Sequence, residues 1–115
     1  EGIRKMIEIV LLNYLKEVLS VDVFMEIPPD PPETYVRIEK TGSSEEEYIE
    51  TATFALQSYA DSMYEAALLN REVIDKMRKI ITLDEVFKVK LNSDYNFTDP
   101  STKKYRYQCI FDITY

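Results

Sequence analysis

The chain has 115 residues, the size of one domain, and hydrophobic residues make up 45% of it. Its formal net charge of −7 means that the whole molecule repels phosphate backbones, so a protein that wraps nucleic acid is disfavoured. The absence of histidine and the presence of only two glycines exclude Ser-His-Asp and Cys-His chemistry, Walker loops and the G-x-G-x-x-G fingerprint. We expect a single domain over residues 1–115.

The lone cysteine, Cys109, cannot form a disulfide within the chain, and no cluster has the spacing of zinc ligands. This cysteine usage fits an intracellular or virion setting better than secretion. The longest apolar run, residues 9–12, is far shorter than the about 20 residues of a membrane-spanning helix, and no signal-peptide pattern opens the chain. We therefore expect a soluble protein with no membrane partner.

Apolar residues recur at steps of three and four over residues 3–20, which predicts a first helix. Extra apolar positions widen its stripe, which indicates either deep burial or a subunit contact. Residues 21–27 alternate with a period of two and predict a strand. Four prolines within residues 28–32 must then form an extended connector, since proline lacks the N–H that a sheet needs. A stiff spacer between strands is favoured over a ligand of an SH3-type groove.

Residues 35–41 alternate again and predict a second strand. The next residues are typical of a loop: Gly42, Ser43 and Ser44. The densest run of charge follows: Glu45, Glu46 and Glu47. Consecutive loop residues diverge, so we expect a solvated tip here rather than an acid and base pair or a cation site. Residues 48–59 predict a third strand of unusual length, part of which projects beyond the sheet.

Ser62 and Glu65 have the S-x-x-E spacing of a capping box and predict the start of a helix over residues 62–81. Its inner stripe is expected at Met63, Ala66, Ala67, Asn70, Val73, Ile74, Met77 and Ile81. Residues 86–91 predict a short strand and residues 92–102 a polar turn region. A last strand is expected over residues 104–115, with Cys109 as a small core residue in its apolar row.

The sequence disfavours a calcium site and an enzyme site built on carboxylates. Asn92, Asp94 and Asn96 resemble the opening of a calcium loop, but Phe97 replaces the required glycine and Lys103 the closing glutamate. An enzyme would have to rely on carboxylates alone. It would need a pocket that holds at least two of these residues with raised pKa values: Glu33, Glu39, Glu50 and Asp61. We expect no enzyme activity, no metal and no cofactor.

The expected order of elements is α-β-β-β-α-β-β. Long alternating strands with helices at two places predict an α+β fold, with a largely antiparallel or mixed sheet and both helices on one face. The chain contains 9 tyrosines, which combine a large contact area with a hydrogen-bonding tip and favour an interaction protein.

Three segments carry a family resemblance. Residues 31–42 form a proline-led strand that ends in Thr-Gly, and residues 54–66 run from a long strand through the Tyr59-Ala60 corner into a helix. Residues 99–102, Asp-Pro-Ser-Thr, precede a strand with Arg-Tyr-Gln at residues 106–108. Together they resemble the tail terminator proteins of long-tailed bacteriophages and their prophages, a family of minor tail, head–tail joining proteins. A tail-terminator-like α+β fold is what this resemblance implies.

The resemblance also implies a function and a set of partners. Such a protein forms a homo-oligomeric ring, a hexamer in the assembled virion, after synthesis in the bacterial cytoplasm. The ring sits on the tail tube at the head-proximal end, stops tube polymerisation and offers a surface to the head-completion protein. DNA passes through its lumen without specific binding, which an acidic wall favours. We expect the subunit or tube interface at Gly42, Ser43, Ser44, Glu45, Glu46, Glu47, Tyr48 and Glu50.

Two other functions remain open. A head-completion or connector protein would meet the portal instead of the tube, and only the identity of the partner separates it from a terminator. A small adaptor outside any phage would be a monomer or dimer with a groove for its partner.

Overall fold

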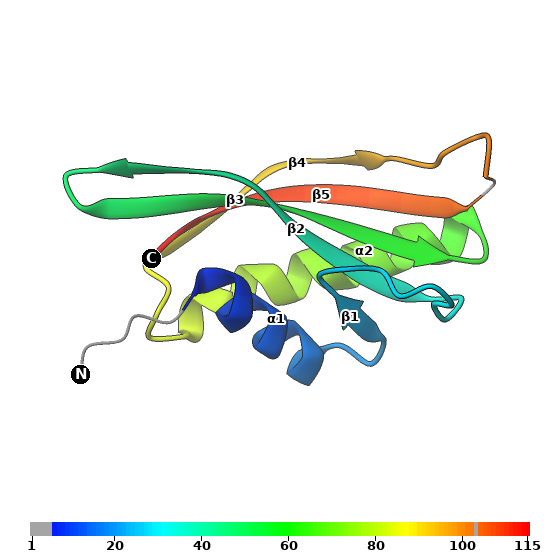
Figure 1. Ribbon diagram of the computed structural model, residues 1–115, viewed down its shortest axis with the longest axis horizontal. Coiled ribbons are helices and arrows are strands. Elements are labelled where there is room, and N and C mark those ends of the chain that lie inside the picture. The colour runs from blue at the N-terminus through cyan, green and yellow to red at the C-terminus, as the bar shows by residue number, and fades with distance from the viewer. Residues whose placement is uncertain (1–5, 103) are drawn as a thin grey trace.

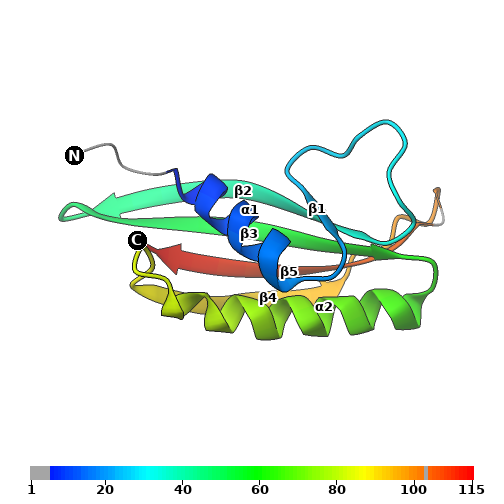
Figure 2. The same cartoon turned by 90° about the horizontal axis from the view of Figure 1, so that it is seen from below.

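The computed structural model describes residues 6–102 and 104–115 and confirms the predicted α+β order (Figure 1). Its elements are α1 (Ile7–Val18), β1 (Asp22–Phe24), β2 (Tyr35–Glu46), β3 (Ile49–Ala60), α2 (Met63–Arg78), the 3-10 helix η1 (Lys79–Thr82), β4 (Lys88–Asn96) and β5 (Tyr105–Thr114). The five strands form one sheet in the order β1-β2-β3-β5-β4, and both helices cover the same face (Figures 1 and 2). The predicted helix start at residues 3–5 lies outside the described residues.

The core lies between this face of the sheet and the two helices. α1 contributes Ile7, Val10, Leu11 and Leu15, all buried. α2 begins at Ser62, whose Oγ accepts a hydrogen bond of 3.1 Å from the Glu65 backbone N–H, which confirms the predicted cap. The fully buried side chains with the largest volumes include Phe54, Phe111, Leu11, Leu15, Leu56, Met77, Ile80 and Ile113. No helix within the described ranges is long and apolar enough to cross a membrane.

β5 confirms the predicted last strand and its apolar row. Cys109, Phe111 and Ile113 are completely buried on the helix-covered side. Burial raises the pKa of the Cys109 thiol to about 12, so this residue is a protonated core side chain at neutral pH.

The strand predicted over residues 21–27 is shorter than expected. β1 has only three residues and pairs with β2 in parallel, Val23 beside Val36, whereas every other neighbouring pair is antiparallel. The sheet is therefore mixed. The proline-rich residues 25–34 make the crossover between the two parallel strands, and the chain bends at Met25 and Glu26, which ends β1 before the first proline.

The end of the second helix differs from its predicted stripe. The chain tightens into η1 at Lys79, and a 3-10 helix has 3.0 residues per turn instead of about 3.6. This change of period turns Ile80 inward, where it is fully buried, and leaves Ile81 44% exposed. The prediction of Ile81 as a core residue is wrong for that reason.

The predicted loop at Gly42–Ser44 is also wrong. β2 continues through these residues to Glu46, with a register shift between Lys40 and Gly42, and the turn lies at Glu47 and Tyr48. Small polar residues are typical of loops, but here they pair with β3 along the edge of the hairpin.

The prediction of a polar turn region over residues 92–102 is wrong for its first part, because residues 92–96 belong to a strand. β4 runs to Asn96, and Tyr95 and Asn96 pair with β5. An edge strand tolerates polar side chains because one side of it meets solvent. Asp94 accepts a hydrogen bond of 2.8 Å from Asn70 of α2, so the residues that resemble a calcium loop are strand residues. Lys103, which would close that loop, lies outside the described residues, and among those described no three acidic or cysteine side chains are grouped to hold a metal.

Replacing Phe111 with alanine tests this core. We expect Phe111→Ala to lower the free energy of unfolding by about 3–5 kcal/mol, because it removes a fully buried ring and leaves a cavity. Urea denaturation followed by circular dichroism measures the loss. Phe87→Ala is the matched control, since Phe87 is 73% exposed, and it should change stability by less than about 0.5 kcal/mol. Equal losses for both variants would contradict the packing described here.

Candidate subunit-contact site

The hairpin of β2 and β3 extends beyond the rest of the sheet. β3 pairs with β5 only from Thr51 onward, so Ile49 and Glu50 have a strand partner only in β2. The tip of the hairpin protrudes past the end of β5 and past both helices (Figures 1 and 2). We call residues 42–50 the arm. The expected projection of the long strand is thereby confirmed.

The turn of the arm has an unusual backbone. Glu47 has φ 52° and Tyr48 has φ 70°, and both lie in the left-handed region. Two-residue hairpin turns with positive φ at both positions normally use Asn-Gly or Asp-Gly, because side chains with a Cβ are strained there. Glutamate and tyrosine at these positions cost on the order of 1 kcal/mol each. The local sequence therefore stabilises this turn less well than glycine would.

The arm exposes large side chains. Tyr48 is 90% exposed and Ile49 is 54% exposed, and the three glutamates that precede them are also exposed. Glu45 stands directly opposite Glu50 across the hairpin, and like charges at such positions repel each other. The arm is thus an acidic tip with an exposed aromatic and apolar end.

The root of the arm is fixed by polar contacts. The Lys40 ammonium lies 3.5 Å from the Glu8 carboxylate of α1, and the Thr53 hydroxyl donates a 2.7 Å hydrogen bond to Asp112. At the base of the tip, the Tyr115 hydroxyl donates to the Glu50 carboxylate at 3.0 Å, and the Tyr115 backbone N–H donates to the Glu50 carbonyl at 3.0 Å. These contacts hold the arm in line with the sheet.

The structure brings all eight predicted interface residues together on the arm. Five of them belong to β2, Glu47 and Tyr48 form the turn, and Glu50 is the second residue of β3. Sequence reasoning missed Ile49 and the neighbouring end of β4. Lys88 of that strand lines a shallow hollow of about 350 Å³ together with Ser44, Glu46, Glu47, Ile49, Thr51 and Thr114. The alternation at residues 86–91 was a signal for a strand, but it did not reveal which end of the sheet that strand would reach.

The four carboxylates of the enzyme hypothesis fall at three different places. Glu39 lies 3.4 Å from Arg37, and Glu50 is on the arm. Glu33 and Asp61 do meet. A hydrogen bond with Asp61, together with its negative charge, raises the pKa of the Glu33 carboxyl above its ordinary value. Both residues of this pair are exposed to solvent, whereas acid and base chemistry on carboxylates depends on an enclosed pocket.

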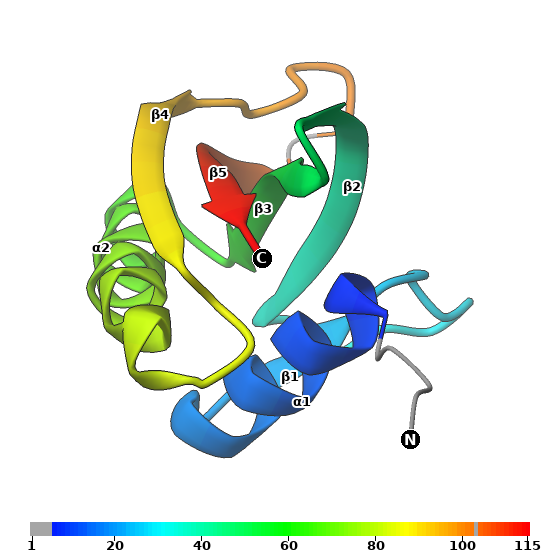
Figure 3. The same ribbon diagram turned by 90° about the vertical axis from the view of Figure 1, so that its left-hand side faces the viewer.

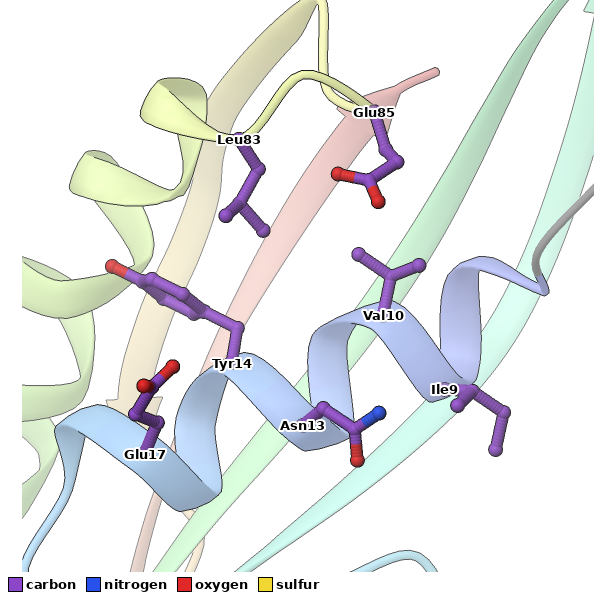
Figure 4. Close-up of a pocket in the computed structure, with 7 residues that line it drawn as sticks. All are labelled: Ile9, Val10, Asn13, Tyr14, Glu17, Leu83 and Glu85. Carbon is purple, nitrogen blue, oxygen red and sulfur yellow. The ribbon is translucent and has the colours of Figure 1, made fainter.

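A second hollow lies between α1 and the segment that follows η1 (Figure 4). It has a volume of about 320 Å³ and is lined by Ile9, Val10, Asn13, Tyr14, Glu17, Leu83 and Glu85. The Tyr14 hydroxyl donates a 2.6 Å hydrogen bond to the Lys76 carbonyl of α2, and burial raises the pKa of Tyr14. The hollow therefore combines apolar side chains with carboxylates and a fixed phenol.

The three segments with a family resemblance meet at the end of the sheet that is farthest from the arm. Tyr35 stacks on Tyr59 with ring centroids 4.4 Å apart. The Arg106 guanidinium donates a 3.1 Å hydrogen bond to the Tyr59 hydroxyl, and the Lys104 ammonium lies 5.5 Å from the centre of the Tyr35 ring. Residues that are far apart in the chain thus form one aromatic and cationic cluster.

No family model matches the chain, and no curated protein matches it either. What the protein does is therefore inferred from its surface and from the three segments described above.

Replacing the turn residues tests the strain at the tip. We expect Glu47→Asn combined with Tyr48→Gly to raise the free energy of unfolding by about 1 kcal/mol, because asparagine and glycine adopt positive φ more easily. Thermal and urea denaturation at low protein concentration measure the change. Tyr48→Ala is the matched control, since it removes the exposed ring but keeps a Cβ at positive φ, and it should give no such gain. A loss of stability in the Asn-Gly variant would contradict the turn geometry.

Proposed function

We propose that this protein is a structural assembly subunit of the phage tail-terminator type. It forms a homo-oligomeric ring, hexameric in the virion, on the end of the tail tube. The ring stops tube polymerisation and offers a surface to the head-completion protein. The observation that carries the proposal is the arm, which projects from the sheet with an exposed aromatic and apolar tip.

The chemistry of the arm supports a contact with another protein chain. An exposed tyrosine beside an exposed isoleucine offers apolar area and a hydrogen-bonding tip, the combination that anchors protein interfaces. The strained turn supports the same conclusion, because strain at a surface persists where a function requires that geometry. A solvent-exposed hairpin without a partner would gain from Asn-Gly at this turn.

The aromatic and cationic cluster supports the family assignment. The resemblance rests on three separate segments, and Tyr59 of the second contacts both Tyr35 of the first and Arg106 of the third. Because these residues pack on each other, a change in one affects the others. The three similar segments therefore form one structural feature.

The net charge supports passage of DNA without binding. A subunit with a net charge of −7 repels a DNA duplex. The total negative charge of a ring grows with each subunit that it contains. The exposed glutamates of the arm add to this repulsion. In this proposal, which follows the family resemblance, the subunit belongs to the head-proximal end of the virion tail and assembles in the host cytoplasm.

A small adaptor is the second candidate, and the hollow of Figure 4 is the observation that favours it. Its apolar lining and the carboxylate of Glu17 suit a partner that presents an apolar side chain and a cation. A head-completion protein would differ from a terminator only in its partner.

Native mass spectrometry over a concentration series tests the proposed function. We expect closed rings at high concentration and monomers at low concentration, and negative-stain images of isolated tail tubes should show the protein at one end. A protein that remains monomeric at every concentration and does not cap tubes would contradict the proposal. A stable dimer that ignores tubes would favour the adaptor.

The same assay with a variant of the arm adds a sharper test. We expect Glu45→Ala, Glu46→Ala and Glu47→Ala together to leave the melting temperature nearly unchanged, because these side chains are exposed, but to alter ring assembly. The matched control replaces three exposed acids outside the arm, Glu26, Asp30 and Asp75, with alanine. A large loss of stability in the arm variant would place its glutamates in the packing of the fold instead.

A further inference from the structure

The sheet has two open edges. β1 covers the outer edge of β2 only from Tyr35 to Arg37, so residues 38–46 have no strand on that side within the described chain. β4 is the last strand at the other edge, and no strand among the described residues pairs with its outer side. Figure 3 shows β2 and β4 on opposite sides of the curved sheet. Each open edge presents backbone N–H and C=O groups that can pair with another strand.

The two edge strands run in opposite directions. β2 is antiparallel to β3, β3 to β5, and β5 to β4, so three reversals separate β2 from β4. Rotating a copy about an axis parallel to the strands keeps every strand direction. β2 of one copy would therefore meet β4 of the next in the antiparallel arrangement, which forms a regular ladder of hydrogen bonds. A contact of two different edges is heterologous, and repeated rotation can close it into a ring.

The register places complementary charges at the same end of the two edges. One row across the sheet runs Ser44, Thr51, Thr114 and Lys88, and a second row runs Gly42, Thr53, Asp112 and Lys90. A rotation about the strand axis keeps these rows level. Ser44 of one copy then faces Lys88 of the next, and Gly42 faces Lys90, which is one consistent antiparallel register.

In this register the long charged side chains come within reach of each other. Glu46 becomes a diagonal neighbour of Lys88 on the same face of the joined sheet, and such neighbours interact when their side chains are long. Both lysines are exposed, as are Glu45 and Glu46.

Apolar side chains gather at the same end of both edges. Phe87, which is 73% exposed, precedes β4 and donates its backbone N–H to the Thr114 carbonyl at 2.8 Å. In the register above it comes opposite Glu45, next to the arm whose tip carries Tyr48 and Ile49. The side chain of Glu45 would then cover part of the exposed Phe87 ring when the edges join.

We propose that the open edge of β2, residues 38–46, pairs in the antiparallel sense with β4 of a second copy of this chain, with the acidic arm against Lys88 and Lys90. The inference rests on the proposed function, since it names the two surfaces that close the ring. It goes further in stating that the sheets of neighbouring subunits are continuous and that the contact is head-to-tail.

Charge reversal tests the two surfaces separately. The arm variant is Glu45→Lys with Glu46→Lys, and the strand variant is Lys88→Glu with Lys90→Glu. We expect each variant alone to need at least about tenfold more protein than the wild type to assemble, because all of its contacts oppose like charges. An equal mixture of the two variants should assemble again in native mass spectrometry. In that mixture the two variants alternate around the ring. The unchanged glutamates of the strand variant meet the unchanged lysines of the arm variant, and at the next contact the introduced lysines meet the introduced glutamates, so no like charges meet.

The controls separate the inference from the proposed function. Glu26→Lys with Asp30→Lys changes the net charge as the arm variant does, and it should assemble like the wild type. Unchanged melting temperatures show that the variants fold, and a chain with all four reversals should assemble by itself. If the wild type assembles and both variants assemble as readily, or if the mixture fails to assemble, the edge contact is overturned while the ring stands. If the wild type never assembles, both are overturned.

Discussion

The pairing of β3 on both sides along its length is the interaction on which the rest of the structure depends. From Thr51 to Ala60 it pairs with β5, and from Ile49 to Tyr59 it pairs with β2. Phe54 and Leu56 are fully buried on its helix-covered face, and Gln57 on its other face is 5% exposed. A strand held on four sides can carry its hairpin beyond the end of the sheet, and this rigid support makes the arm a defined surface instead of a mobile loop.

The two faces of the sheet are stabilised in different ways. The face under the helices is apolar, and burial of its side chains drives folding. On the opposite face the Gln57 amide donates a 2.8 Å hydrogen bond to Gln108, and Arg37 and Arg106 extend this network to Glu39 and Tyr59. These hydrogen bonds join side chains of neighbouring strands, and they favour the register in which those side chains stand level. That register determines which residues stand level at the two open edges.

The parts of the fold that depend on local patterns were predictable from the sequence. The period of α1, the Ser62 cap and the apolar row around Cys109 each reflect neighbours in the chain. Gly42 was predicted as a loop residue because its own neighbours in the chain do not indicate the pairing with β3 that keeps it in β2. Residues 92–96 were predicted as a turn for the same reason, since their strand partners come from β5. The acidic arm was predicted from its charge. Its counterpart at Lys88 was not, since only the strand order places these residues at one end of the sheet.

The open edge of β2 is the feature on which the proposed assembly depends. Edge strands invite pairing with other chains, and most proteins block them; in our proposal the exposed glutamates restrict that pairing to a cationic partner. Amide hydrogen exchange, compared between dilute monomer and assembled protein, tests this account most directly. The account predicts that assembly slows exchange in residues 38–46 and 88–96, while the buried amides of β3 exchange as before. Slower exchange at the hollow beside α1 instead, with both edges unchanged, would contradict it.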